Sequence, residues 1–255
     1  MSDTPDFLGI EGRAFAITGA SSGIGRAAAI MASQHGARVA LIGRREAELE
    51  RTRESMHGAG HMVMPFDVSA HEEIPRLFRS IVDEMGALDG LLHAAGVHAT
   101  TPLRIVAADQ AALLFDINVT SSLMLTKGFR HAKVRGSEPS VVLMSSAVGL
   151  VGEAGVSVYA ASKAAVASLG RSLALELARE GVRVNSIAAG IVETELTAGL
   201  RQRVGAEAWA QIEDAHPLGV GTVEDAASAA MYLLSPASRW VTGTALVVDG
   251  GYTAR

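Results

Sequence analysis

The chain has 255 residues, of which 49% are hydrophobic and 19% are charged, a balance that excludes a disordered chain and can fill a sizeable core. Its net charge of -5 at pH 7, with no basic cluster beyond one arginine pair, argues against a nucleic-acid partner. The sequence contains no cysteine, which excludes disulfides, thiolate metal ligands and cysteine nucleophiles.

At the start of the chain, residues 1–6 are polar and acidic and lack the basic and apolar segments of a secretory signal. Charged residues recur too often along the sequence for a membrane-spanning helix, which needs about 18 apolar residues in a row. The sequence therefore predicts a cytoplasmic protein with no membrane partner.

From Arg13 onward, short apolar segments alternate with longer segments of helical periodicity, the pattern of βαβ units around a parallel sheet. Strands are predicted at residues 14–18, 38–42, 62–66, 90–93, 141–145, 182–187 and 245–248. Helices are predicted at residues 24–35, 46–57, 71–85, 104–133 with a break near Ala108 and Asp109, 158–179 and 223–235. This alternation predicts an α/β fold: one Rossmann-type, doubly wound domain over residues 1–255, with a seven-stranded parallel sheet and helices on both faces. Residues 193–217 hold no predicted strand and are expected to form a partly helical substrate lid.

The first strand leads directly into a glycine-rich turn, Thr18-Gly19-Ala20-Ser21-Ser22-Gly23-Ile24-Gly25, which opens the first predicted helix. A dinucleotide pyrophosphate binds at such a turn, where backbone N–H groups are free and the helix dipole is positive. Glycine permits both the tight turn and the close approach of backbone to ligand. The candidate cofactor contacts here are Gly19, Ser21, Ser22, Gly23 and Ile24. Taken alone, the motif is equally compatible with an ordinary strand-to-helix turn.

After the second predicted strand, the chain has Gly43-Arg44-Arg45 where NAD-binding proteins usually carry an acidic residue. A carboxylate repels a 2′-phosphate, whereas an arginine binds it through paired, charge-assisted hydrogen bonds. We therefore expect NADP(H) to be the preferred cofactor, with Arg44 among its contacts and NAD(H) as the second candidate. In the alternative interpretation, both arginines only face solvent at a helix start.

Tyr159 and Lys163 are one helical turn apart in an alanine-rich segment, so their side chains share one helix face. The pKa of free tyrosine is about 10, and a neighbouring cation is expected to lower it. Tyr159 could then protonate a carbonyl oxygen or deprotonate an alcohol. A serine at the end of the fifth predicted strand, Ser145 or Ser146, could bind the same substrate oxygen, or could only end the strand.

Several motifs occur in one order from about Gly12 to Tyr252. They are the glycine-rich turn, Asp67-Val68, Asn118, Ser146, Tyr159 with Lys163, Val241-Thr242-Gly243 and Val248-Asp249-Gly250-Gly251. With these motifs the chain resembles the short-chain dehydrogenase/reductase family, of the single-domain type that includes the 3-oxoacyl-acyl-carrier-protein reductases.

The resemblance implies a role for each matching residue. Tyr159 is implied to be the acid/base, Ser146 to position the carbonyl, and Lys163 to hold the nicotinamide ribose and lower the pKa of Tyr159; Tyr159 and Lys163 thus both contact the cofactor. Asn118 is implied to support a water-linked proton relay through its main chain. The other implied contacts are Asp67 and Val68 at the adenine, and Gly190, Val192 and Thr194 at the nicotinamide. A homotetramer built on the helices near 110–133 and 158–179 and on the C-terminal segment is also implied.

Two positions depart from the family pattern. His93-Ala94 stands where the family usually has Asn-Asn, so hydrogen bonds that stiffen the central strands must be replaced. His93, a candidate cofactor contact, either takes over those bonds or is a packed core histidine. Ala189 stands where the family usually has proline, which should make the following loop more flexible. The other histidines lack metal-ligand spacing, so no metal site is predicted.

The sequence thus predicts a short-chain NAD(P)-dependent dehydrogenase/reductase that transfers a hydride between NADP(H) and a small ketone or secondary alcohol. The alternative is a non-catalytic dinucleotide-binding sensor or scaffold protein. Acyl thioesters, cyclic ketones, steroids and sugars all stay open as substrates. An apolar substrate is suggested by Leu150, Val151, Leu196, Leu200 and Trp209.

Overall fold

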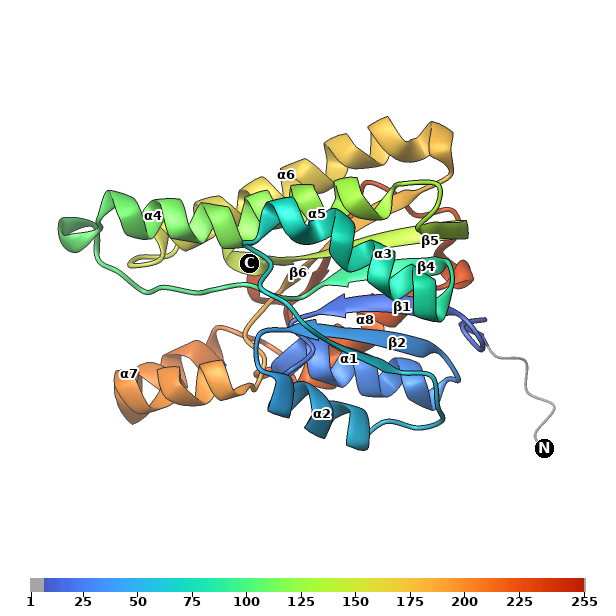
Figure 1. Cartoon of the computed structure of the whole chain (residues 1–255). Helices are drawn as coiled ribbons and strands as arrows, with labels where there is room; N and C mark the ends of the chain where they lie inside the picture. Colours follow the sequence, from blue (N-terminus) through green and yellow to red (C-terminus); the bar gives the residue numbers. More distant parts are fainter. Residues whose placement is uncertain (1–6, 255) are drawn as a thin grey trace.

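The computed structural model describes residues 7–254, without the side chains at 196, 198–200 and 202–204. At its centre lies a sheet of seven parallel strands in the order β3-β2-β1-β4-β5-β6-β7, which confirms the predicted doubly wound α/β fold (Figure 1). The strands are β1 (Ala14–Thr18), β2 (Arg38–Gly43), β3 (Met62–Pro65), β4 (Leu88–His93), β5 (Arg135–Ser146), β6 (Arg183–Ala189) and β7 (Ala245–Val248).

Helices cover both faces of this sheet. They are α1 (Gly23–Gln34), α2 (Glu46–Glu54), α3 (Ile74–Met85), α4 (Ala108–Phe115), α5 (Ser121–Phe129), α6 (Ser157–Leu177), α7 (Glu195–Asp214) and α8 (Val223–Leu234). Helices α3 to α6 lie on one face, and α1, α2 and α8 lie on the other (Figure 1). No helix in the described part of the chain is long and apolar enough to cross a membrane.

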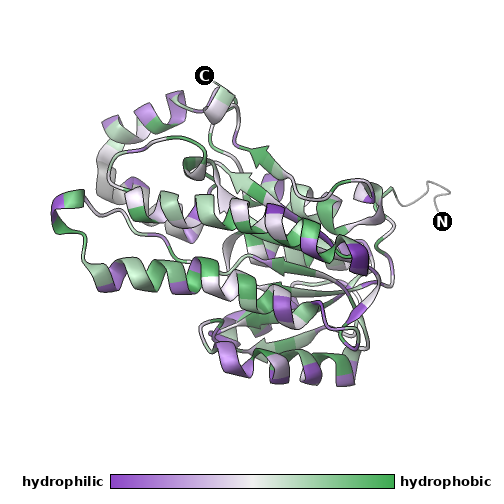
Figure 2. Ribbon diagram, turned by 90° about the horizontal axis from the view of Figure 1, so that it is seen from above, coloured by the Kyte–Doolittle hydropathy of each residue, from purple (hydrophilic) through white to green (hydrophobic). Residues whose placement is uncertain are grey.

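Alternate residues of each strand supply two separate cores. In β1, Ala14 and Ala16 pack with α3, α5 and α6, whereas Phe15 and Ile17 pack with α1 and α8. The strands are therefore apolar on both faces, as is usual for a parallel sheet between two helix layers. Figure 2 shows this pattern, with hydrophobic colours along most of the strands and mixed colours on the helices.

The helix predicted at residues 104–133 is broken close to the predicted point near Ala108 and Asp109, and it is also interrupted by a π-helical turn that was not predicted. The structure divides the segment into a 3-10 turn at Leu103–Ile105, helix α4, a π-helical turn at Asp116–Thr120, and helix α5. The chain is extended at Val106 and Ala107, with ψ of 126° and 147°, and this extension separates the first two pieces. A π-helical turn holds an extra residue and occurs frequently at functional sites.

Strand β5 begins at Arg135, well before the predicted start at residue 141. The first part of the strand is polar and contains Pro139, a composition that strands usually avoid, so the sequence pattern did not reveal it. Arg135 pairs with Leu88 of β4, and a register shift between Leu88 and Gly90 accommodates the irregular segment. The other elements begin and end within a few residues of their predicted positions.

Ligands of doubly wound sheets bind at the carboxyl ends of the strands where the strand order reverses. Here this point lies between β1 and β4, where Thr18 pairs with His93. Gly19 follows Thr18 with a φ of 69°, and a Cβ atom there would lie 2.7 Å from the Ala95 nitrogen. A Cβ atom on Gly25 would clash with the carbonyl group of Gly19. The turn after β1 can therefore pack in this way only with glycine at both positions.

The segment expected to be a lid contains helix α7. The helix begins with reciprocal hydrogen bonds: the Thr197 nitrogen donates to Thr194 Oγ1 at 3.2 Å, and the Thr194 nitrogen donates to Thr197 Oγ1 at 2.7 Å. Gly205 interrupts the helix with a φ of 80° and a ψ of 172°. The two halves of α7 therefore meet at a kink that glycine permits.

Candidate active site

Ser146, Tyr159 and Lys163 meet at the carboxyl end of β5. Ser146 is the last residue of β5, and α6 begins at Ser157, so Tyr159 lies in the first turn of α6 and Lys163 in the next. The Ser146 hydroxyl forms a hydrogen bond with the Tyr159 phenol. The Lys163 Nζ lies 5.8 Å from the centre of the Tyr159 ring. The structure thus brings together the three side chains that were expected to act together.

The two serines at the end of β5 have different partners. Ser145 Oγ donates to the Lys163 carbonyl oxygen at 2.7 Å and ties β5 to α6. Ser146 Oγ lies beside the phenol of Tyr159, and the Ala189 carbonyl oxygen, 3.3 Å away, is the alternative acceptor for its one hydroxyl proton. Neighbouring residues of a strand point to opposite faces, so only one of the two can face Tyr159. Of the two serines that sequence reasoning left open, Ser146 is therefore the one that lies beside Tyr159.

The pKa of Tyr159 is raised above its ordinary value. Enclosure of the side chain by protein disfavours the phenolate and outweighs the hydrogen bond with Ser146, which favours it. The charge of Lys163 does not contribute to this shift. The Lys163 Nζ donates to the Met144 carbonyl oxygen at 2.8 Å. The predicted lowering of the Tyr159 pKa by Lys163 is therefore wrong. Burial also lowers the pKa of Lys163 to about 8.

Asn118 lies in the π-helical turn and fastens the segment that follows β4. Its Oδ1 accepts from the Val97 nitrogen at 2.9 Å, and its Nδ2 donates to the Val97 carbonyl oxygen and to Ser162 Oγ, both at 3.0 Å. A Cβ atom on Gly96 would lie 3.1 Å from Asn118 Oδ1 and 3.4 Å from Lys163 Nζ. Asn118 therefore holds the main chain at residues 96–97 close to Lys163.

His98 is a residue of the site to which sequence reasoning assigned no chemistry. Its ring lies edge-on to the ring of Tyr159, with centroids 4.5 Å apart and an interplanar angle of 72°. His98 directly follows Val97, whose main chain Asn118 holds on both sides. The one signal in the sequence is its place just after the fourth strand. His98 thus forms a wall of the site next to the phenol.

Arg45, rather than Arg44, lies against the glycine-rich turn. Arg45 Nη2 donates to Ser21 Oγ at 3.1 Å and to Ser22 Oγ at 3.0 Å. The Arg44 side chain is exposed, and its charge acts on Asp67. Consecutive residues of an extended segment point in opposite directions, and the composition of an arginine pair does not reveal which member faces the turn.

The glycine-rich turn fits a dinucleotide pyrophosphate. Ser22 is the N-cap of α1, yet its side chain caps no backbone N–H of the helix. Gly19 and Gly23 have φ values of 69° and 51° and place no side chain over this helix end. Backbone N–H groups and the positive end of the helix dipole suit the pyrophosphate, and the Arg45 guanidinium beside Ser21 and Ser22 suits a further phosphate.

Asp67 and Val68, the predicted adenine contacts, follow β3 at the same edge of the sheet. Asp67 Oδ1 accepts from the Ser69 nitrogen at 3.0 Å and from Ser69 Oγ at 2.8 Å. These two bonds lower the pKa of Asp67, so its carboxylate is ionised at neutral pH. Val68 is buried beneath the turn that Asp67 forms with Ser69.

The loop after β6, with Gly190, Val192 and Thr194, approaches the glycine-rich turn. A Cβ atom on Gly190 would lie 2.8 Å from the Asp249 Cα, so glycine lets this loop approach the segment that follows β7. The Val192 side chain is buried. Thr194 is the N-cap of α7, and its Cγ2 would lie 3.3 Å from a Cβ atom on Gly23. The start of α7 therefore lies beside the predicted pyrophosphate site.

His93 lies in the protein interior. Its side chain is 2% exposed, and its two ring nitrogens lie 2.7 Å from Thr18 Oγ1 and 2.8 Å from Ser121 Oγ. Both nitrogens are engaged by protein groups, so the predicted contact of this ring with the cofactor is wrong. Instead, His93 takes over bonds between the central strands, which was the first of the two interpretations offered by its sequence position.

The expected apolar wall of the substrate site is only partly described. Leu150 is 46% exposed and Val151 is half-buried, so both can meet a substrate. Trp209 is 4% exposed, and its Nε1 donates to Glu213 Oε1 at 2.7 Å, so it packs within the lid instead. The side chains of Leu196 and Leu200 lie outside the described part of the chain.

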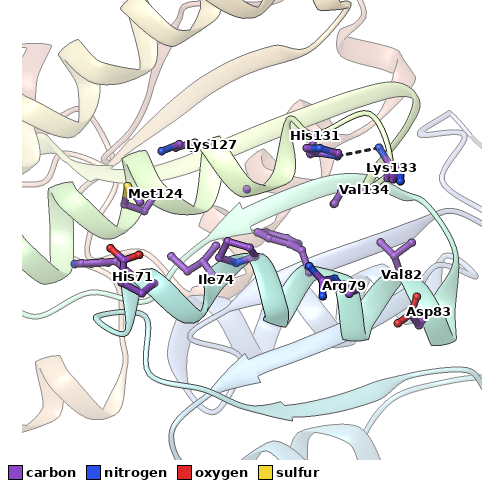
Figure 3. Close-up of a pocket in the computed structure, with 14 residues that line it drawn as sticks. His71, Ile74, Arg79, Val82, Asp83, Met124, Lys127, His131, Lys133 and Val134 are labelled. Carbon is purple, nitrogen blue, oxygen red and sulfur yellow. Dashed lines mark hydrogen bonds between the residues drawn. The ribbon is translucent and has the colours of Figure 1, made fainter.

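A groove of about 850 Å³ lies between α3 and α5 (Figure 3). Its apolar lining includes Ile74, Val82 and Met124, and charged side chains such as Arg79 and Lys127 surround it (Figure 3). None of the predicted catalytic or cofactor residues is among the described residues that line it. The candidate site is therefore the carboxyl edge of the sheet and not this groove.

Known proteins resemble this chain over nearly its whole length. The family described as enoyl-(acyl carrier protein) reductase matches residues 19–253. The chain is 36% identical over 253 residues to cis-4-hydroxycyclohexanecarboxylate dehydrogenase of Sinomonas cyclohexanicum, covering 95% of this chain and 99% of that protein. It is 31% identical over 245 residues to a 3-oxoacyl-[acyl-carrier-protein] reductase of Vibrio cholerae, covering 96% and 98%. The solved structure of a short-chain type dehydrogenase/reductase from Mycobacterium ulcerans matches with a TM-score of 0.89 and 32% identity, covering 96% of this chain and 91% of that chain.

Proposed function

Because the chain belongs to the short-chain dehydrogenase/reductase family of NAD(P)-dependent oxidoreductases, we propose that it interconverts a small ketone and a secondary alcohol with Tyr159 as the acid/base. The observation that carries this proposal is the hydrogen bond between the Ser146 hydroxyl and the Tyr159 phenol. It lies beside a buried amine, Lys163, at the edge of the sheet where ligands of this fold bind.

The raised pKa of Tyr159 suits the role of acid in ketone reduction. At neutral pH the phenol keeps its proton, so it can donate that proton to the carbonyl oxygen of the substrate. Ser146 Oγ would donate to the same oxygen and hold the carbonyl in place. When bound, the nicotinamide supplies the hydride for the carbonyl carbon. In the reverse direction, Tyr159 takes the proton of the alcohol.

Lys163 and Asn118 would supply and return protons. The pKa of Lys163 is about 8, so the amine can exchange protons near neutral pH as well as hold the hydroxyls of the nicotinamide ribose. The Asn118 carbonyl oxygen accepts from Ser122 Oγ at 2.7 Å and has a second lone pair for a water molecule. A water chain along this carbonyl would link Lys163 to solvent.

For the cofactor, we propose a preference for NADP(H) over NAD(H). Two cations follow β2 directly: Arg45 against Ser21 and Ser22, and Arg44 near Asp67. Together they favour the extra phosphate of NADP(H) over a bare ribose hydroxyl. The glycine-rich turn would hold the pyrophosphate, Asp67 and Val68 the adenine, and the segment from Gly190 through Val192 to Thr194 the nicotinamide.

The assembly is also a proposal. One NAD(P)-binding domain over the whole chain, with α7 as the substrate lid, accounts for the continuous sheet from β1 to β7.

A homotetramer formed through α4, α5, α6 and the C-terminal segment would cover apolar side chains that are exposed on these elements. They include Leu113, Leu123, Leu175 and Trp240, at 55%, 40%, 80% and 91% exposed. Sedimentation analysis distinguishes a tetramer from a monomer.

Consumption of NADPH and NADH in the presence of chemically diverse ketones tests the reaction. The names of the relatives suggest a 3-oxoacyl thioester and a 4-oxocyclohexanecarboxylate as the first substrates of the panel. We expect the wild-type protein to turn over at least one ketone. Tyr159→Phe should bind the cofactor normally but lose turnover on the order of a hundredfold or more, because it removes the transferable proton. Cofactor binding without turnover of any ketone or alcohol would indicate a non-catalytic sensor instead.

A further inference from the structure

His93 completes an unbroken line of hydrogen bonds where the strand order reverses. Thr18 Oγ1 lies 2.7 Å from His93 Nδ1, and His93 Nε2 lies 2.8 Å from Ser121 Oγ. At one end of the line, the Ala95 nitrogen donates to Thr18 Oγ1 at 3.1 Å. At the other end, Ser121 Oγ donates to the Ile117 carbonyl oxygen. Thr18, His93 and Ser121 are 0%, 2% and 0% exposed, so water does not compete for these bonds.

The ends of the line determine where each proton lies. Ser121 has one hydroxyl proton and gives it to the Ile117 carbonyl, so its oxygen accepts from His93 Nε2. A neutral imidazole donates through one nitrogen only, so His93 Nδ1 accepts from the Thr18 hydroxyl. Thr18 Oγ1 accepts in turn from the Ala95 nitrogen. Every group in the line is satisfied only when His93 is neutral and carries its proton on Nε2.

The surroundings of the ring favour this neutral form. Burial, and then the positive charge of Lys163, lower the pKa of His93 to about 3. A second proton, on Nδ1, would also displace the hydrogen bond that Thr18 donates to this nitrogen. The ring is therefore neutral at pH 7.

The line joins two parts of the site. Thr18 directly precedes Gly19, whose backbone packs against Ala95 so closely that a Cβ atom would lie 2.7 Å from the Ala95 nitrogen. Ser121 directly follows the π-helical turn that contains Asn118. His93 therefore lies between the turn assigned to the pyrophosphate and the turn that fastens the main chain beside Lys163.

We propose that His93 is a positioning residue, whose ring, protonated on Nε2, holds the glycine-rich turn and the Asn118 turn in one register. Where the family usually has an asparagine, this chain spans the distance from β1 to α5 with a single imidazole and two hydroxyls. The claim that this alignment of the two turns serves catalysis rests on the proposed function. The bonding of the ring does not depend on it.

The tautomer is tested directly on the wild-type protein by NMR of ¹⁵N-labelled histidine. We expect the His93 ring to show a proton on Nε2 alone, unchanged from roughly pH 5 to roughly pH 8. A proton on Nδ1 at neutral pH, or a ring that becomes charged within this range, would overturn the proposal. The measurement needs no turnover, so it stands even if no ketone is reduced and the proposed function fails.

A matched pair of variants tests the positioning. Ser121→Ala and Thr126→Val each remove a buried hydroxyl of α5 that donates to the carbonyl four residues earlier, but of the two only Ser121 accepts from His93. We expect Ser121→Ala to lower kcat roughly three- to tenfold with the cofactor Kd nearly unchanged, and Thr126→Val to leave both nearly unchanged. If the role of Ser121 is purely structural, both variants should have a lower Tm and the same kcat as each other. That result would refute the proposal.

The variant His93→Phe completes the test, because it removes both ring bonds. It should weaken cofactor binding and lower kcat, and adding Ser121→Ala should then cost little more. Fully additive effects of the two substitutions would show that the bond between these residues does no positioning. If His93→Phe does not fold, the comparison of Ser121→Ala with Thr126→Val decides the question.

Discussion

Two buried histidines join parts of the site in different ways. His93, 2% exposed, links β1 to α5 through contacts of 2.7 and 2.8 Å with side-chain hydroxyls. His216, 4% exposed, links α7 to the loop after β6: its Nδ1 donates to the Ile212 carbonyl oxygen at 2.7 Å, and its Nε2 accepts from the Ile191 nitrogen at 3.4 Å. The His216 ring also stacks on Tyr252, with centroids 4.8 Å apart.

We refer to Thr18, His93, Ser121 and the turn with Asn118 as the braced region, and to His216 with Ile191, Ile212 and Tyr252 as the lid joint. In the braced region, both ring nitrogens make short contacts with buried side-chain hydroxyls of other elements. In the lid joint, the one short bond runs to Ile212 of α7, four residues earlier, and only ring stacking and one long bond reach Tyr252 and the loop after β6. On the proposal that α7 is the substrate lid, this difference predicts that α7 moves without moving the groups that react.

The largest effect is expected beside the braced region, at Lys163. Lys163→Met keeps the length of the side chain but removes the amine, so kcat/KM should fall on the order of a hundredfold. The unfolding free energy at pH 7 should not fall, because burial disfavours the ammonium. Turnover and thermal unfolding measure the two effects. A strong loss of Tm would show that the amine is needed for the fold and not for the reaction.

The pH dependence of stability gives a second test at Lys163. Its pKa is about 8 in the folded chain and 10.5 when unperturbed, so the unfolded chain binds the proton more tightly. Below about pH 8 both states hold the proton and the cost of burying it is constant. Between about pH 8 and 10.5 the folded state releases it first, so the unfolding free energy gains up to about 3 kcal/mol from this group as the pH rises. Lys163→Met should lack this gain.

At the glycine-rich turn, which the brace supports, Arg45→Ala should come next in size. Removing charge-assisted bonds to a 2′-phosphate should lower kcat/KM for NADPH about tenfold or more and change that for NADH little. Arg44→Ala is the matched control. Both arginines are exposed, but Arg45 is the one that contacts Ser21 and Ser22, so Arg44→Ala should have the smaller effect. If Arg44→Ala had the larger effect, the contact expected from sequence would be the correct one.

The features that sequence reasoning predicted depend on spacing along the chain. The glycine-rich turn, the Tyr159 and Lys163 pair and the doubly wound sheet are each specified by residues close together or by a repeated pattern of elements. The geometry of the backbone then determines where these features lie in the fold, and the surrounding side chains have little influence on it. For this reason the edge of the sheet that carries the site could be predicted from the sequence.

The features that it missed depend on residues distant in the sequence. Ser121 as the partner of His93, and Tyr252 as the partner of His216, become neighbours only when the sheet and its helices have formed. The pKa of Tyr159 was predicted in the wrong direction for the same reason. Its helix neighbour is evident from the spacing, but its enclosure, which dominates, is a property of the tertiary structure.

At the lid joint, His216→Phe should have a moderate effect. The substitution keeps an aromatic ring to stack on Tyr252 but removes both hydrogen bonds, including the long one to Ile191. We expect the cofactor KM to rise roughly threefold with kcat nearly unchanged, because the reacting groups stay braced. In the ¹⁵N spectrum of the wild-type protein, His216 should carry its proton on Nδ1, opposite to His93. A loss of kcat as large as that of His93→Phe would remove the distinction between the two regions.

The smallest effect is expected at the far end of the lid, where Glu195 begins α7. Its Oε1 lies 3.3 Å from Arg26 Nη1, with the two side chains 63% and 33% exposed. Exposed ion pairs contribute from zero to about 1 kcal/mol, and salt screens them, so Glu195→Gln should change the cofactor Kd by less than about threefold at physiological salt. Arg26 also keeps its bond to the Ser21 carbonyl oxygen, at 2.5 Å, so the turn itself should not move. If Glu195→Gln changed the cofactor Kd more than His216→Phe does, α7 would be anchored at α1 and not at the lid joint. The difference between His93 and His216 would then say nothing about how the lid is held.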